Sequence, residues 1–146
     1  MIYLGTLDDK GRISLPARIR GSIDADRLIL TKGITKSIWV FHPDEWDLFI
    51  KDQLKKSAPL SLSKQMMVQH SFIAPKAEME IDKAGRIAIP QDLRDFACLN
   101  RDCKILEVVN HLEIWDAEQY KAYEKAIESQ LMEVLEEMLG SERSGN

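Results

Sequence analysis

The sequence holds few of the residues that build metal centres and disulfide frameworks. It has two cysteines and three histidines among 146 residues. Cys98 and Cys103 stand five positions apart, with no second cysteine pair and no histidine spacing that suits zinc, which needs a tetrahedral set of converging ligands. The histidines at 42, 70 and 111 are scattered along the chain. We therefore expect no metal centre and no cofactor, and two small thiols that pack in or near the core.

Long apolar runs and nucleotide-binding loops are also missing. No run approaches the roughly 18 apolar residues of a membrane span, and "MIYLGTLDDK" lacks the basic and apolar regions of a signal peptide. No P-loop, glycine-rich dinucleotide fingerprint or nucleophile elbow is present. These absences favour a cytoplasmic protein with no membrane partner, no small-molecule substrate and no catalytic residue.

The net charge of −4 is unevenly distributed. Residues 116–146 hold eight acidic and three basic side chains, whereas residues 1–115 hold 16 acidic and 17 basic side chains. The acidity therefore belongs to the C-terminal segment, and the rest of the chain can still present a basic surface to a partner. The length is that of one globular domain.

One charged segment occurs twice. "LDDKGRISLPARIR" at 7–20 returns as "IDKAGRIAIPQDLR" at 81–94, with six identities in fourteen at a shift of 74. The shift also aligns later apolar and acidic positions, so the duplication covers about 7–46 and 81–120. This period is too long for a solenoid unit and suits two pseudo-symmetric halves of one domain. The identical pairs are Asp8 and Asp82, Gly11 and Gly85, Arg12 and Arg86, Ile13 and Ile87, Pro16 and Pro90, and Arg20 and Arg94.

Each copy begins with a tight turn followed by a strand. "DDKG" places Asp8 at the first and Gly11 at the fourth position of a type I turn, and 82–85 repeats the arrangement. In the next strand the apolar residues point to one side, while Arg12 or Arg86 points to the other. The apolar side is expected to build a core, and the arginine side to face water or a partner.

Helices are expected after these strands. "PARIRGSI" and "PQDLRDFACL" suit short helices, Pro43 suits the start of "PDEWDLFIKDQLKK", and Asp116 caps a longer C-terminal helix. We expect a single domain over 1–140, made of repeats at about 1–56 and 76–130, with a linker helix at about 62–73 and a disordered tail at 141–146.

Two D-x-x-x-R turns, each opening "GRI-x-[LI]-P" and each followed by an apolar run and a helix, closely resemble the MraZ family, relatives of the AbrB-type (SpoVT-AbrB) transcription regulators. The resemblance extends from residue 1 to about 138. It implies an α+β fold: a pseudo-two-fold swapped-hairpin β-barrel from two internal repeats, with peripheral helices and a long C-terminal helix. It also implies a homo-oligomeric ring on the nucleoid that binds repeated promoter elements of double-stranded DNA, commonly upstream of a division and cell-wall gene cluster.

The resemblance gives the turn residues roles in DNA binding. An arginine can donate two hydrogen bonds to a guanine edge, whereas a lysine is better suited to anchoring a phosphate. The aspartate of each turn is expected to position the arginine four places on, because a carboxylate beside a phosphate is repelled. The expected DNA-binding residues are Lys10, Arg12, Arg18, Lys83 and Arg86, and the expected turn-positioning residues are Asp8, Gly11, Asp82 and Gly85.

The two copies are not equally basic. Lys10 directly precedes the turn glycine, whereas the second copy has alanine there and a lysine one place earlier. Arg18 and Arg20 of the first short helix correspond to Asp92 and Arg94 of the second. The N-terminal half is therefore expected to carry more of the binding. As an alternative to a DNA contact, Arg20 and Arg94 are expected to brace the barrel.

Two other functions fit parts of the sequence. Asp8 and Asp82 could form an acid dyad like that of aspartic proteases, but both belong to turns with lysines beside them, and neither is followed by Ser or Thr and then Gly. The stronger alternative is a ring-forming scaffold or protein-binding module with only weak DNA binding. The net charge favours this scaffold, whereas the duplicated arginine turn disfavours it.

Overall fold

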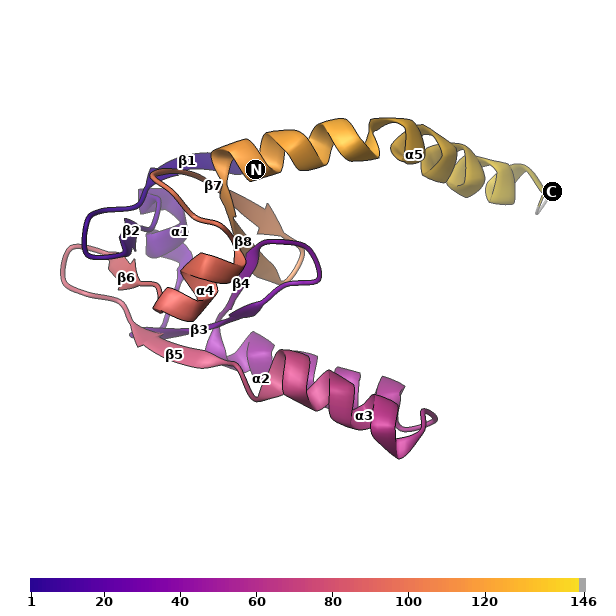
Figure 1. The fold of residues 1–146 in the computed structure, drawn as a ribbon, viewed down its shortest axis with the longest axis horizontal. Helices are drawn as coiled ribbons and strands as arrows, with labels where there is room; N and C mark the ends of the chain where they lie inside the picture. Colours follow the sequence, from indigo (N-terminus) through magenta and orange to yellow (C-terminus); the bar gives the residue numbers. More distant parts are fainter. Residues whose placement is uncertain (145–146) are drawn as a thin grey trace.

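A computed structural model describes residues 1–144 and shows an α+β protein (Figure 1). Its elements in chain order are β1 (Ile2–Thr6), β2 (Arg12–Ser14), α1 (Ala17–Ser22), β3 (Arg27–Lys32), β4 (Ile38–Phe41), α2 (Pro43–Ser57), α3 (Leu62–Val68), the π-helical turn η1 (Gln69–Ile73), β5 (Ala77–Glu80), β6 (Arg86–Ala88), α4 (Gln91–Phe96), β7 (Asp102–Val108), β8 (His111–Asp116) and α5 (Ala117–Ser144).

Two antiparallel sheets form the body of the molecule. The larger sheet has six strands in the order β1-β7-β8-β4-β3-β5, and the smaller pairs β2 with β6. β1 of the first half pairs with β7 of the second half, and β5 of the second half pairs with β3 of the first. Each half therefore supplies a strand that completes the sheet of the other.

The expectation of a closed barrel was wrong for the described residues. β1 and β5 are the two edges of the larger sheet and do not pair with each other. Each leads into a tight turn, at 8–11 and at 82–85, after which the chain pairs in the separate sheet of β2 and β6. The sheet stays open because these turns lead the chain away from both edges.

One apolar core joins the two halves. Ile13 and Ile87 face each other across β2 and β6, and both are fully buried. They belong to a cluster with Leu30 of the first half and Ile105 of the second. Because burying one such side chain contributes about 1.5–3 kcal/mol, this shared cluster ties the small sheet firmly to the large one.

Two helices begin where the sequence predicts. Pro43 lies in the first turn of α2, and the Nδ1 atom of His42 accepts the N–H of Asp44 at 3.0 Å. Asp116 caps α5, because its carboxylate accepts the N–H groups of Glu118 and Gln119, both at 3.1 Å. These caps satisfy amide groups that a helix start leaves without partners.

The segment between the halves and the C-terminal segment are both helical. The linker expected at about 62–73 consists of α3 followed directly by η1. α5 continues to Ser144, so it includes the beginning of the expected tail at 141–146, whereas 145–146 lie outside the described residues. Within residues 1–144, no helix has both the length and the apolar character that a membrane span requires.

The elements divide between two ends of the molecule. In Figure 1, the turns before β2 and β6 lie at one end, whereas α2, α3 and α5 project toward the other. α5 leaves along one side of the body, and α2 with α3 lies along the opposite side. The arginine-bearing turns are thus well separated from the long helices.

Candidate nucleic-acid interface

The small sheet places the two predicted DNA-binding arginines on one face. Arg12 pairs with Ala88, and Arg86 pairs with Ser14. Paired residues point to the same side of an antiparallel sheet, as do residues two apart along a strand. Arg12 and Arg86 therefore share the outer face, while Ile13 and Ile87 fill the inner, buried face.

The first turn is held together by Asp8. Its Oδ1 atom accepts the N–H groups of Lys10 at 2.9 Å and Arg12 at 2.8 Å, and its Oδ2 atom accepts Nε of Arg12 at 2.8 Å. The carbonyl oxygen of Asp8 accepts the N–H of Gly11 at 3.0 Å. One carboxylate thus fixes both the backbone of the turn and the direction of the arginine.

The second turn repeats this network. The Oδ1 atom of Asp82 accepts the N–H groups of Ala84 at 2.9 Å and Arg86 at 2.8 Å, and its Oδ2 atom accepts Nε of Arg86 at 2.9 Å. Its carbonyl oxygen accepts the N–H of Gly85 at 2.9 Å. The structure therefore gives Asp8 and Asp82 the same positioning geometry.

Each aspartate engages only one side of its guanidinium group. In both turns the ion pair runs through Nε, and no partner of the terminal Nη nitrogens of Arg12 or Arg86 is found in the described part of the chain. The side chains of Arg12 and Arg86 keep 29% and 34% of their surface exposed. The outer edge of each guanidinium group is consequently available to an external acceptor.

The charge state of the two aspartates argues against an acid dyad. The pKa of Asp8 is lowered, chiefly because its carboxylate accepts the backbone N–H of Arg12, and the pKa of Asp82 is lowered in the same way by Arg86. A dyad that shares one proton requires one raised pKa, which arises when two carboxylates lie close together. Each carboxylate is instead bound within its own turn and stays ionised at neutral pH.

The turn glycines are required by conformation and by space. Gly11 and Gly85 have φ angles of 76° and 77°, in the region that favours glycine. A Cβ atom on Gly11 would lie 2.7 Å from Cζ of Arg94, and a Cβ atom on Gly85 would clash with the guanidinium group of Arg20. Both positions therefore exclude a side chain on two independent grounds.

Arg20 and Arg94 each support the turn of the opposite half. Arg20, in α1, donates from Nη1 to the carbonyl oxygen of Ala84 at 2.8 Å. Arg94, in α4, lies against Gly11, and its buried Nε has no hydrogen-bond partner. The repeat marks both arginines at the sequence level, but their partners are 64 or more positions away, which local patterns do not reveal.

The predicted lysines and Arg18 lie in different settings. Lys10 and Lys83 are exposed at the tips of the two turns. Arg18 is exposed in α1 and contacts Sδ of Met1 through Nη1 at 3.4 Å, at the start of β1, whereas the first turn follows the other end of that strand. The structure thus brings the lysines, but not the recorded contact of Arg18, to the turns.

Arg101 is a candidate that sequence reasoning missed. Its carbonyl oxygen accepts the N–H of Leu7 at 2.8 Å, and its side chain shares a surface hollow with Asp8 and Asp9. At the second turn the corresponding acceptor for Ile81 is the carbonyl oxygen of Asp26. Strand pairing alone sets a basic residue of the second half beside the first turn and an acidic residue of the first half beside the second.

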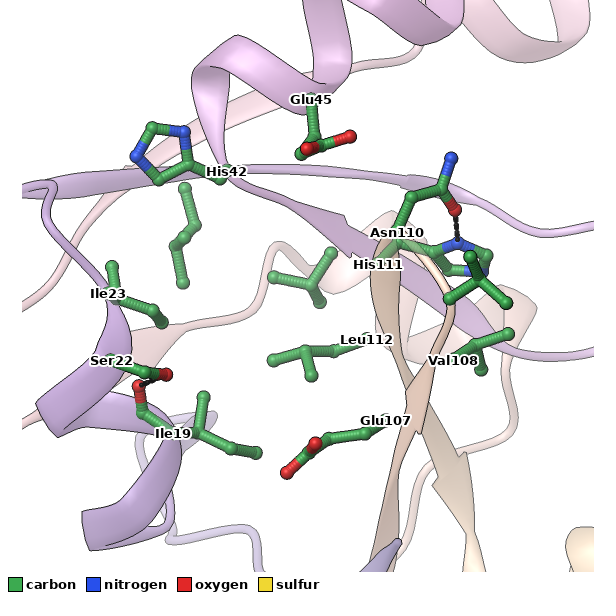
Figure 2. Close-up of a pocket in the computed structure, with 13 residues that line it drawn as sticks. Ile19, Ser22, Ile23, His42, Glu45, Glu107, Val108, Asn110, His111 and Leu112 are labelled. Carbon is green, nitrogen blue, oxygen red and sulfur yellow. Dashed lines mark hydrogen bonds between the residues drawn. The ribbon is translucent and has the colours of Figure 1, made fainter.

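The molecule also has a cavity away from these residues. It has a volume of about 260 Å³ and lies between α1 and the β7–β8 hairpin (Figure 2). Ile19, Val108 and Leu112 supply apolar walls, and Asn110 pairs with Nδ1 of His111 at 2.8 Å beside it. None of the predicted site residues lines this cavity. In the described part of the chain, no group of three or more His, Cys, Asp or Glu side chains is arranged to hold a metal ion.

The fold and the turns define a class of internally duplicated α+β proteins that display paired arginines on one face of a small sheet. The chain belongs to the MraZ family, as the sequence resemblance indicates: residues 3–70 and 72–142 match the family model described as "MraZ protein, putative antitoxin-like".

Individual relatives match most of the chain. A protein of Treponema denticola is 41% identical over 134 residues, which cover 92% of each chain. A protein of Treponema pallidum (strain Nichols) is 43% identical over 121 residues, covering 83% of this chain and 80% of the relative. A protein of Natranaerobius thermophilus is 34% identical over 134 residues, or 92% of each chain. All three are named "Transcriptional regulator MraZ".

Proposed function

We propose that the protein is a transcriptional regulator that binds double-stranded DNA through Arg12 and Arg86. The observation that carries the proposal is the placement of both guanidinium groups on one face of the β2–β6 sheet, each held only through Nε. The names of the relatives, which are transcriptional regulators, support the same function.

Sequence specificity would come from the outer edges of the two arginines. That edge offers two parallel N–H donors, which fit the O6 and N7 acceptors of guanine in the major groove. Asp8 and Asp82 hold the guanidinium groups in place before DNA arrives, so that less side-chain entropy is lost on binding. The aspartates are positioning residues, and the arginines make the contact.

Affinity would come from phosphate contacts repeated around a homo-oligomeric ring. Lys10 and Lys83, exposed at the turn tips, suit the phosphates that flank the guanine contacts. A ring multiplies weak contacts when its DNA carries repeated elements, such as promoter repeats upstream of a division and cell-wall gene cluster. Such a regulator acts in the cytoplasm on the nucleoid and needs no cofactor or small-molecule substrate.

The proposal includes a swapped-hairpin origin of the fold. Support comes from the exchange of strands between the halves, since β1 pairs with β7 and β5 pairs with β3. The exchange would place one arginine-bearing turn from each half on the same face of every subunit. Both turns, and not only the more basic first one, would then contact DNA.

A ring-forming scaffold with weak DNA binding is the second candidate. The observation that favours it is α5, which is acidic and carries exposed apolar side chains suited to a protein partner. The scaffold gives no role to the outward arginines, whereas the regulator accounts for them directly.

Fluorescence anisotropy on the protein's own upstream duplex and on a scrambled duplex, over a salt series, tests the proposal. We expect preference for the upstream duplex and affinity that falls steeply with salt. Arg12→Ala and Arg86→Ala should each weaken binding roughly 5-fold to 150-fold, which corresponds to about 1–3 kcal/mol per guanine contact.

Lys36→Ala is the matched control, since Lys36 is an exposed charge in the loop between β3 and β4. It should lower affinity far less than either arginine change. No preference between the duplexes, together with arginine variants that bind like the native chain at its assembled mass, would favour the scaffold.

A further inference from the structure

The outer part of α5 is an amphipathic helix that no other element of its own subunit covers. Near its start, Tyr120 and Tyr123 pack on Trp115, with ring centroids 5.2 and 4.9 Å apart. From residue 128 to residue 139 every side chain is exposed. Because buried apolar surface supplies most of the free energy that holds a helix in place, this part of α5 lacks the packing that its sequence suits.

The uncovered part of α5 carries a narrow apolar stripe. Ile127, Leu131, Val134 and Met138 follow each other at spacings of four, three and four residues, which places them on one helix face. Val134 and Met138 are 49% and 62% exposed. This seam spacing is the one with which a helix packs lengthwise against a second helical element.

The pseudo-symmetry of the fold indicates what kind of element is missing. α2 follows β4 in the first half as α5 follows β8 in the second, and α2 is covered by α3. Gln65 of α3 fastens that hairpin, since its Nε2 donates to the carbonyl oxygens of Leu60 at 2.8 Å and Ala58 at 3.3 Å. The chain that follows α5 is too short to supply an equivalent of α3.

The α2–α3 hairpin (residues 43–68) has a surface complementary to the stripe. Leu48, Leu62 and Met67 are large apolar side chains that it leaves exposed, with Leu62 at 74%. Residues 50–68 hold four basic side chains and one acidic side chain, whereas residues 124–139 of α5 hold five acidic and one basic. Opposite charges around two apolar surfaces favour their association and set its orientation.

We infer that the stripe of α5 packs on the α2–α3 hairpin of a second copy of this chain, and that this contact builds the ring. The two surfaces lie on opposite sides of the body (Figure 1), so each copy can bind one neighbour through α5 and another through its hairpin. Such a head-to-tail contact produces a ring when the rotation closes. The turns lie at the other end of the molecule and stay exposed. This inference rests on the ring of the proposed function.

Light scattering coupled to size exclusion tests the stripe on the full chain. Val134→Lys should reduce the assembled mass to the 16.7 kDa of one chain at micromolar concentration. Ser129→Lys adds the same charge on the opposite face of α5 and should leave the assembled mass unchanged. Circular dichroism should show both variants folded, because neither site is buried within the subunit.

A charge exchange tests the identity of the partner surface. One variant reverses the hairpin (Lys51→Glu, Lys55→Glu, Lys64→Glu), and the other reverses α5 (Glu124→Lys, Glu128→Lys, Glu137→Lys). Each alone should run as a single chain, whereas their equimolar mixture should recover the native mass by alternating around the ring. If the hairpin variant assembles by itself, or the mixture stays dissociated, the head-to-tail contact is wrong.

The native chain separates this inference from the proposed function. If it runs as a single chain, the ring and the inference both fail, while DNA binding by the turns is still measured by anisotropy. If it assembles, and Val134→Lys assembles equally, only the inference fails.

Discussion

At the residue scale, the site depends on short side chains that do several tasks at once. Asp8 and Asp82 each accept three hydrogen bonds through the carboxylate, two from backbone amides and one from an arginine. Replacing either by asparagine would keep the shape but remove the charge that orients the guanidinium group. The negative side chain is therefore compatible with a DNA-facing turn because its charge is already paired.

The glycine of the second turn gives a prediction at this scale. Gly85→Ala should destabilise the protein by about 2 kcal/mol, because the positive φ angle is unfavourable and the new Cβ meets Arg20. Arg20→Ala should relieve the clash but not the φ cost, so the double variant loses less stability than the two single changes together. Urea unfolding at a fixed protein concentration measures all three.

Gly21→Ala provides the control for that comparison. A Cβ atom at Gly21, within α1, meets nothing within 4 Å. The change should therefore be neutral or stabilising by up to about 1 kcal/mol. Equal effects at Gly21 and Gly85 would contradict the account of the turn.

At the element scale, α4 ends in a hydrogen-bond pattern that glycine suits better than the residue present. The N–H of Leu99 donates to the carbonyl oxygen of Arg94 at 3.0 Å, and the N–H of Cys98 donates to that of Asp95 at 3.1 Å. Cys98 has a φ angle of 53°, in the left-handed region. This is a Schellman motif with a non-glycine residue at its left-handed position.

Cys98→Gly should therefore stabilise the protein by about 0.5–1 kcal/mol, which would raise the Tm by a few degrees. Cys98→Ser keeps the Cβ atom and should give no gain. Thermal unfolding followed by circular dichroism compares the three proteins. A glycine variant less stable than the serine variant would show that Cys98 contributes contacts worth more than the backbone strain.

The other cysteine illustrates how an element sets chemistry. Cys103 lies on β7 and is buried, and burial raises the pKa of its thiol to about 11. The thiol is therefore neutral at physiological pH and a weak nucleophile. This placement agrees with the small packed thiol that the sequence predicts.

At the scale of the whole molecule, the two halves cannot be separated. β1 and β5 each pair with a strand of the opposite half, β2 pairs with β6, and Arg20 and Arg94 support each other's turns. The apolar core likewise takes side chains from both halves. Folding therefore depends on contacts between distant parts of the sequence.

Fragments 1–75 and 76–146 should each be unfolded alone and should fold when mixed. Each fragment lacks the partner of an edge strand and half of the core around Ile13 and Ile87. Circular dichroism and size exclusion of the separate and mixed fragments measure this. A fragment that folds alone would show that one repeat is a domain in its own right.

The sequence by itself determined the local parts of this protein. The spacing of Asp8, Gly11 and Arg12, repeated 74 positions later, predicts both turns and the aspartate–arginine pairs, because all of these contacts join residues within four positions. Pro43 and Asp116 likewise predict the starts of α2 and α5. Hydrogen bonds of such short range follow from residue type and spacing alone.

Only the tertiary structure decided which half each piece supports. The open sheet, the contacts of Arg20 and Arg94 with the opposite turns, and the placement of Arg101 beside the first turn all depend on strand pairing between the halves. The two copies offer nearly identical patterns, so the sequence does not state whether a strand pairs within its own copy or with the other. The shared burial of Ile13 and Ile87 favours the exchange, because one core then removes more apolar surface from water than two small ones.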